Sequence, residues 1–119
     1  MAKRFTREEI KQRFQASIDA GQPIVIASAG IGIAAKFAER GGADMIGLFN
    51  SSYLGLGRVE ATSLMPYGNA NDIVMSLGDR IFPVVQNTPI LGGIIGSDPT
   101  REMTPFLKIM QFKGFPAVI

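Results

Sequence analysis

Apolar residues recur at helical spacing near the start of the chain. Ile10, Phe14 and Ile18 follow one another at four-residue intervals and predict one buried helical face. Thr6 and Glu9 have the spacing of a capping box, in which the threonine hydroxyl accepts from the Glu9 amide and the Glu9 carboxylate accepts from the Thr6 amide. We therefore expect a well-capped first helix.

Short, continuously apolar segments then alternate with amphipathic segments. The apolar segments lack polar alternation, which is typical of parallel strands covered on both faces. They span residues 23–28, 44–49, 88–95 and 115–119. The sequence therefore predicts four buried strands.

Three further helices are expected between these strands. The first spans about residues 31–40, and the second follows a long loop, residues 50–66, and carries Val74 and Leu77 on its apolar face. Asp98 and Pro99 are expected to open the third helix, because aspartate is a favoured N-cap and proline is tolerated at the first helical position.

This order of elements predicts a parallel α/β fold, either a doubly wound sheet or a (βα)8 barrel. The chain ends in an apolar strand, whereas a C-terminus is usually exposed, and a complete barrel needs about 250 residues. We therefore expect residues 1–119 to be the N-terminal part of a single TIM-barrel domain, that is, its first half with an N-terminal capping helix, truncated in strand four. An autonomous four-stranded domain is the alternative. The open edges of a half barrel predict self-association.

Composition and charge narrow the possible functions. The chain contains no cysteine, histidine or tryptophan, which excludes thiol nucleophiles, Ser-His-Asp triads and the usual zinc sites. A net charge of +2 with scattered basic residues gives no nucleic-acid footprint. No run approaches the roughly 18 apolar residues of a membrane span. We expect a cytoplasmic protein that binds neither nucleic acid nor membrane.

Candidate binding residues gather where the predicted strands end, because parallel α/β folds bind ligands at the carboxyl ends of their strands. The candidates for substrate binding are Ser28, Gly30, Asn50, Ser51, Ser52, Tyr53 and Arg58. Hydroxyls and turned backbone amides bind carboxylate or phosphate oxygens, and an arginine in the following loop would add charge as a lid residue. An ordinary polar loop with Asx or Ser turns accounts equally well for residues 50–53.

Two further features have alternative interpretations. Asp98, after the third strand, is the candidate catalytic residue and the candidate ligand of Mg²⁺, although an N-cap also explains it. Gly30, Gly32 and Ala35 match a dinucleotide-binding pattern, but Asn50 stands where such a site needs an acid. A tight turn with close helix packing is the simpler explanation of the glycines.

Several segments, taken together and in order, resemble one family. They are residues 5–10, 21–25, 28–32 and 39–44, the block from Leu64 through Met65, Pro66, Tyr67 and Gly68 to Asn71, and Gly96–Pro99. Over nearly the whole chain they are similar to the phosphoenolpyruvate hydrolase-like TIM-barrel family, whose members are about twice this length. The block around Met65 to Gly68 is the most specific piece.

The resemblance implies a phosphoenolpyruvate/pyruvate-type barrel, a small anionic phosphorylated or keto-acid substrate and usually magnesium. One implied function is a metal-assisted hydrolase or lyase, in which Ser51 and Ser52 hold the anion and Asp98 holds the metal. The other is a non-catalytic, ligand-sensing signal-transduction barrel. Gly96 stands where a second metal-binding acid would be usual. The complete protein is expected to be a homo-oligomer.

Overall fold

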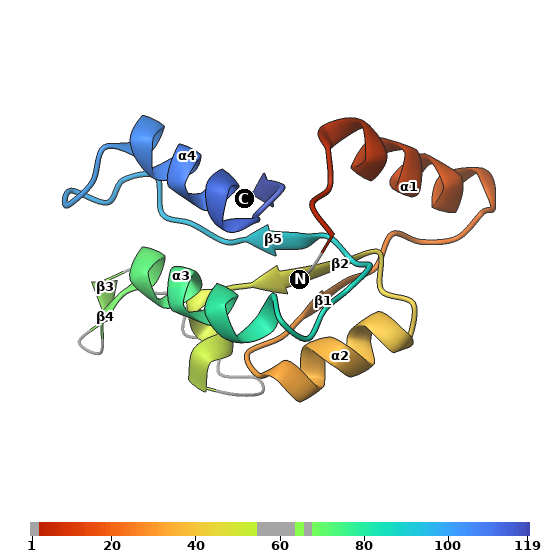
Figure 1. Ribbon diagram of the computed structural model, residues 1–119, viewed down its shortest axis with the longest axis horizontal. Coiled ribbons are helices and arrows are strands. Elements are labelled where there is room, and N and C mark those ends of the chain that lie inside the picture. The colour runs from red at the N-terminus through yellow and green to blue at the C-terminus, as the bar shows by residue number, and fades with distance from the viewer. Residues whose placement is uncertain (1–2, 55–63, 66–67) are drawn as a thin grey trace.

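Four parallel strands form one sheet in which the strands follow chain order (Figure 1). The computed structural model describes residues 3–54, 64–65 and 68–119. The strands are β1 (Ile26–Ser28), β2 (Met45–Leu48), β5 (Ile90–Gly92) and β6 (Ala117–Val118). Because each strand is added beside the previous one, β1 and β6 are the two edges. The expected parallel α/β class is confirmed.

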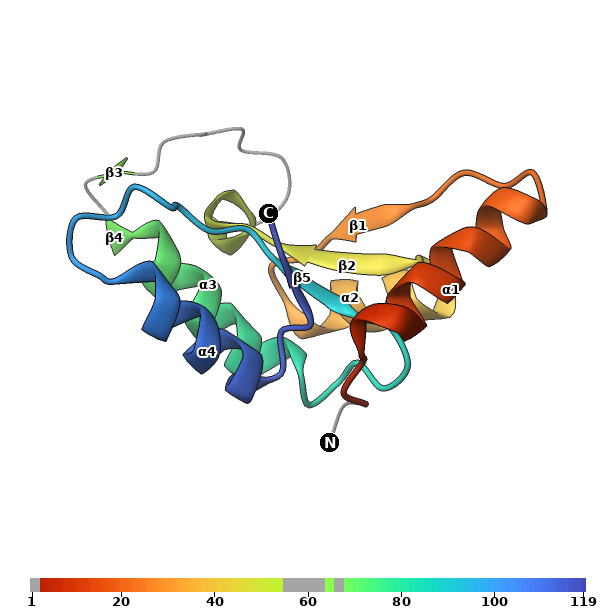
Figure 2. The same ribbon diagram turned by 90° about the horizontal axis from the view of Figure 1, so that it is seen from above.

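Helices alternate with these strands within the described ranges. They are α1 (Arg7–Asp19), α2 (Gly32–Arg40), α3 (Ala70–Ile81) and α4 (Met103–Lys113), and a 3-10 helix, η1 (Asn50–Leu54), follows β2. A short antiparallel pair, β3 (Leu64–Met65) with β4 (Gly68–Asn69), precedes α3. In both views α1 lies at the N-terminal ends of the sheet strands (Figures 1 and 2). The 3-10 helix η1 and the β3–β4 pair lie at the carboxyl ends.

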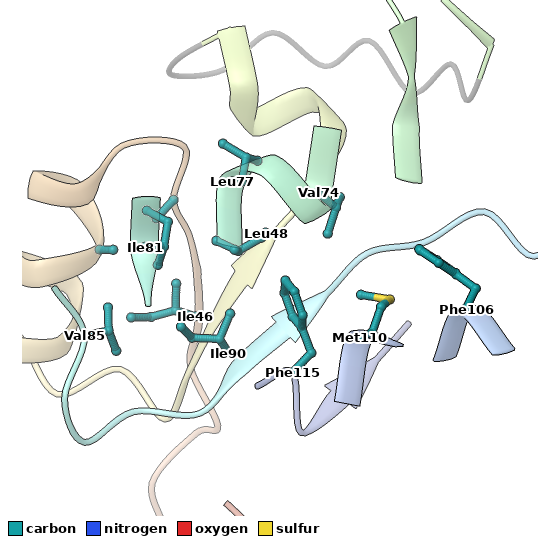
Figure 3. Packing of buried hydrophobic residues seen from close by; sticks show 12 residues of the cluster. Ile46, Leu48, Val74, Leu77, Ile81, Val85, Ile90, Phe106, Met110 and Phe115 are labelled. Carbon is teal, nitrogen blue, oxygen red and sulfur yellow. The ribbon is translucent and has the colours of Figure 1, made fainter. Parts of the chain in front are cut away.

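The main hydrophobic core lies between the sheet and α2, α3 and α4. Alternate strand residues, Ile46, Leu48 and Ile90, point into it and are at most 2% exposed. Their partners come from all three helices and from the segment before β6 (Figure 3): Ala35, Val74, Leu77, Ile81, Phe106, Met110 and Phe115. Full burial of one such side chain contributes about 1.5–3 kcal/mol, so this layer dominates stability.

The first helix packs against the other face of the sheet. Ile10 lies with Met45 and Leu91 in a second, smaller cluster. The capping box is confirmed, since the Glu9 amide donates to the Thr6 hydroxyl at 3.2 Å and the Thr6 amide donates to the Glu9 carboxylate at 2.8 Å. None of the helices in the described parts of the chain is long and apolar enough to cross a membrane.

Three sequence-based expectations need correction. The segment before and within β1 was expected to be covered on both faces, but Ile24, Val25 and Ile26 are 39–47% exposed because β1 is an edge strand. The loop expected over residues 50–66 contains η1 and β3. The last helix begins at Met103, with Glu102 as N-cap and no capping side chain, so the expected opening of this helix at residues 98–99 is wrong.

One aromatic ring lies across two neighbouring strands on the face of the sheet that α1 also contacts. A Cβ at Gly47 would lie 2.6 Å from the Phe49 ring, and a Cβ at Gly93 would overlap the same ring. Phe49 belongs to the smaller cluster with Met45 and Leu91. The two glycines thus clear the space that lets a half-buried ring lie flat at the carboxyl ends of β2 and β5.

Replacing Gly93 by alanine is expected to displace this ring, because the added methyl group meets the Phe49 side chain. Overpacking of this kind costs about 1–3 kcal/mol. The matched control is Gly96→Ala, since a Cβ there meets nothing within 4 Å and should change stability by less than about 0.5 kcal/mol. Urea unfolding of the two variants measures the difference, and equal stabilities would contradict this packing.

Candidate functional site

Two serine hydroxyls meet where β1 and β2 end. Oγ of Ser28 and Oγ of Ser52 lie 2.7 Å apart, within hydrogen-bond distance. Ser28 is the last residue of β1, and Ser52 lies in η1, whose turn is closed by the Ser52 amide donating to the Phe49 carbonyl at 2.9 Å. A Cβ on Gly30 would overlap the Ser52 carbonyl oxygen. Glycine at position 30 is therefore what allows the turn after β1 to approach η1.

One of the two hydroxyl hydrogens of this pair is not used in the hydrogen bond between them. Each hydroxyl has one hydrogen and two acceptor lone pairs, so a hydrogen bond between them uses one hydrogen and leaves the other. Ser28 is exposed and Ser52 half-buried. The second hydrogen is therefore available to an oxygen of a bound molecule.

The remaining predicted binding residues fall into two groups. Asn50, Ser51 and Tyr53 all lie in η1, next to the hydroxyl pair along the chain. Arg58 lies outside the described residues. The structure thus brings Ser28 and Gly30 against η1, and the binding role of all seven positions stays a prediction.

Asp98 lies in a second polar cluster and is surrounded by donors. Its Oδ1 accepts from the amide and the hydroxyl of Thr100, at 2.9 and 2.6 Å. Its Oδ2 accepts from Nδ2 of Asn69 and of Asn71, both at 2.9 Å, and from Nε of Arg101 at 2.7 Å. The Asp98 side chain is 2% exposed. These five hydrogen bonds exceed the roughly four lone-pair sites of a carboxylate, so no acceptor site is left over.

These donors keep the carboxylate ionised. The Thr100 hydroxyl makes the largest contribution, and the Asn69 side chain, the Thr100 amide and the Asn71 side chain add to it. Burial acts in the opposite direction but is outweighed, so the pKa of Asp98 lies far below its usual range. At neutral pH this carboxylate is therefore a fixed negative charge and not a proton acceptor.

The cluster fastens the segment after β5 to the start of α3. The Asn71 side chain accepts from the Ile95 amide at 2.8 Å and donates to the Ile95 carbonyl at 3.1 Å. Asn69 is the N-cap of α3 and accepts from the amides of Asn71 and Asp72. Arg101 also pairs with Asp72. Sequence reasoning missed Arg101, although its position three residues after Asp98 could have suggested the pair.

The donor set around Asp98 does not fit a magnesium ion. Both oxygens are occupied, and one of the neighbours is the Arg101 guanidinium, which would repel a cation. Within the described part of the chain, no three acidic residues are grouped so that they could hold a metal. We therefore propose no metal-dependent step at Asp98.

Comparison with known proteins now identifies the family. The family model described as phosphoenolpyruvate hydrolase-like matches residues 9–119. The chain belongs to the phosphoenolpyruvate hydrolase-like family. The resemblance inferred from the sequence is thus confirmed for this family over nearly the whole chain.

Three curated relatives contain a segment that is similar to this chain. The chain is 41% identical over 113 residues to the ToMV resistance protein Tm-1(GCR237) of tomato, Solanum lycopersicum, covering 94% of this chain and 15% of that protein. It is 41% identical over 110 residues to the ToMV susceptible protein tm-1(GCR26), with 92% and 15% covered. Identity to the putative transcriptional regulatory protein y4pA of Sinorhizobium fredii is 32% over 118 residues, with 95% and 19% covered. The chain spans less than a fifth of each relative.

Replacing Asp98 by asparagine is expected to lower stability most at neutral pH. The carboxyl pKa is lower in the folded than in the unfolded chain, so its contribution to the free energy of unfolding is complete above about pH 5 and declines as the pH falls below about 4. The deficit of Asp98→Asn relative to the parent should therefore shrink toward about pH 2.

Denaturant unfolding across this pH range measures the effect, with the exposed Asp19→Asn as control. Any pH dependence that the control shares with Asp98→Asn is not specific to the buried carboxylate. A deficit of Asp98→Asn that is constant with pH would contradict the ionised, donor-saturated carboxylate.

Proposed function

We propose that this chain forms the first half of a (βα)8 barrel, within one TIM-barrel domain, that binds a small phosphorylated or keto-acid anion where β1 and β2 end. The observation that carries the proposal is the Ser28–Ser52 hydroxyl pair, 2.7 Å apart at the strand ends, where parallel barrels bind their ligands. Membership of the phosphoenolpyruvate hydrolase-like family supports this ligand class. A cytoplasmic location, expected from the sequence, is part of the proposal.

The ligand contacts follow from the chemistry of the turn. The spare hydroxyl hydrogen donates to a carboxylate or phosphate oxygen, and the backbone amides of η1 add neutral donors that bind anions without formal charge. The Phe49 ring, on the same chain segment, offers an apolar surface to the carbon end of the ligand. Arg58 is proposed to add a positive charge from the loop that follows.

Asp98 has a positioning role in this proposal. For it to act as a catalytic base or a metal ligand, at least one of its five donors would have to leave. Its charge instead fixes the loop after β5 against the start of α3, so that the carboxyl end of the sheet keeps its shape when a ligand binds.

A ligand-sensing barrel without turnover is the second candidate function. The donor-saturated carboxylate favours it, because the residue expected to perform acid-base chemistry is already occupied. The names of the relatives agree with this candidate, since they describe resistance to a virus and transcriptional regulation. Binding with turnover would identify an enzyme, and binding without it a sensor.

Removing both hydroxyls, Ser28→Ala with Ser52→Ala, is expected to weaken binding of phosphoenolpyruvate at least tenfold. Each lost hydrogen bond costs about 1 kcal/mol, rising toward 3 when the ligand atom is charged. Isothermal titration calorimetry with phosphoenolpyruvate, pyruvate and phosphate measures the change in affinity. Release of phosphate from phosphoenolpyruvate measures turnover.

The control variant is Ser97→Ala, because Ser97 is an exposed serine in the segment that follows β5. It should bind like the parent. Ser51→Ala, by contrast, tests a candidate binding residue, and weaker binding would show that this hydroxyl also contacts the anion. Parental affinity in the double variant, or no affinity of the parent for any of the three anions, would overturn the proposed site.

A further inference from the structure

The Phe49 ring lies next to Ser28 on one face of the sheet. Ser28 is opposite Gly47 in the register of β1 and β2, and opposite residues of neighbouring strands point to the same face, about 4.8 Å apart. A Cβ on Gly47 would lie 2.6 Å from Cε2 and 3.1 Å from Cζ of Phe49. One edge of the ring therefore occupies the space that a side chain at Gly47 would take, beside the Ser28 side chain.

The rest of the ring extends across the sheet to β5. A Cβ on Gly93 would overlap Cδ1 of the Phe49 ring. Phe49 is the first residue after β2 and is half-buried. One face of the ring thus rests on the backbone of the two glycines, and the accessible part of the ring points away from the sheet, where the strands end.

The surface around the ring carries no charge. Every second residue of a strand points to the same face, so the register of β1, β2 and β5 specifies which residues belong to this surface. They are Ile26, Ser28, Gly47, Phe49, Leu91 and Gly93. Of these six side chains, only that of Ser28 has a polar atom. A ligand bound here therefore has its charge at the serine end and its uncharged part on the aromatic ring.

The electrostatics of the ring orient such a ligand. The face of an aromatic ring is partly negative and its edge is partly positive, and the edge formed by Cε2 and Cζ is the one beside Ser28. A carboxylate that accepts the second hydroxyl hydrogen of the Ser28–Ser52 pair also lies near this positive edge. The carbon chain of the ligand is then directed across the face of the ring toward β5.

We propose that Phe49 determines the shape of the ligand. The ring selects small carboxylic acids in which the carbon next to the carboxylate is trigonal, as in 2-oxo and enol acids, over acids in which it is tetrahedral. A trigonal carbon keeps its substituents in one plane, which stacks on the ring at about 3.5 Å. At a tetrahedral carbon, substituents project from both sides of that plane, so one of them stands between the ligand and the ring. This inference rests on the proposed anion site at the serine pair.

Pyruvate and lactate form a matched pair for testing this selection. They have the same charge and the same number of carbons, and they differ in the geometry of the second carbon. Isothermal titration calorimetry of the parent chain should give about three- to tenfold tighter binding of pyruvate than of either lactate enantiomer, the range expected for one aromatic stacking contact. Phosphoenolpyruvate and 2-phospholactate form a second pair with the same difference.

Phe49→Leu should remove the preference, because leucine keeps an apolar side chain but has no planar face. Pyruvate and lactate should then bind within about twofold of each other, and the affinity for inorganic phosphate, which has no carbon chain, should change by less than about twofold. Circular dichroism and thermal unfolding verify that the variant is folded, since Phe49 belongs to the cluster with Met45 and Leu91.

Two glycine variants test the position of the ring without removing it. Gly93→Ala displaces the Phe49 ring and should narrow the preference for pyruvate. Gly96→Ala is the matched control and should keep the preference, because a Cβ there meets nothing within 4 Å. These variants and the comparison within the parent chain decide the question even if Phe49→Leu does not fold.

Equal affinity of the parent for pyruvate and lactate, or a preference that survives in folded Phe49→Leu, would refute the selection by Phe49. Either result leaves the serine site standing if affinity still falls in the variant that combines Ser28→Ala with Ser52→Ala. A parent chain that binds none of these acids would refute the serine site and, with it, the selection by the ring.

Discussion

The pairing of β2 with β5 determines where the other elements of the sheet lie. Every residue of both strands is buried, with the main core on one face and the α1 cluster on the other. This central pair fixes the directions of both strands, and therefore the places where η1 and the segment after β5 begin. β1 and β6 add one strand to each side and inherit the same direction. The two polar groups lie at the same end of the sheet because this pair aligns the strands that they follow.

The two polar groups at those ends have different physical characters. Asp98 is buried, ionised and saturated with donors, so moving it would leave several donors unsatisfied, which is costly in a buried site. The Ser28–Ser52 pair is more exposed, is neutral and retains a free donor. One group is therefore built to stay in place, whereas the other is able to exchange a partner for a ligand at little cost. This difference is why we propose a binding role for the serines and a positioning role for the carboxylate.

Local patterns predicted most of the fold, and contacts between distant residues account for what they missed. The capping box and the four alternating strands depend on neighbours within a few residues, and both were found from the sequence. The Asp98–Pro99 pair also carried a strong local signal for a helix start, but the side chains that hold Asp98 come from Asn69 and Asn71, 29 and 27 residues earlier. The meeting of Ser28 with Ser52 similarly joins residues 24 apart. The candidate residues could therefore be predicted from their residue type and their position at the end of a strand. The distant side chains that contact them could not.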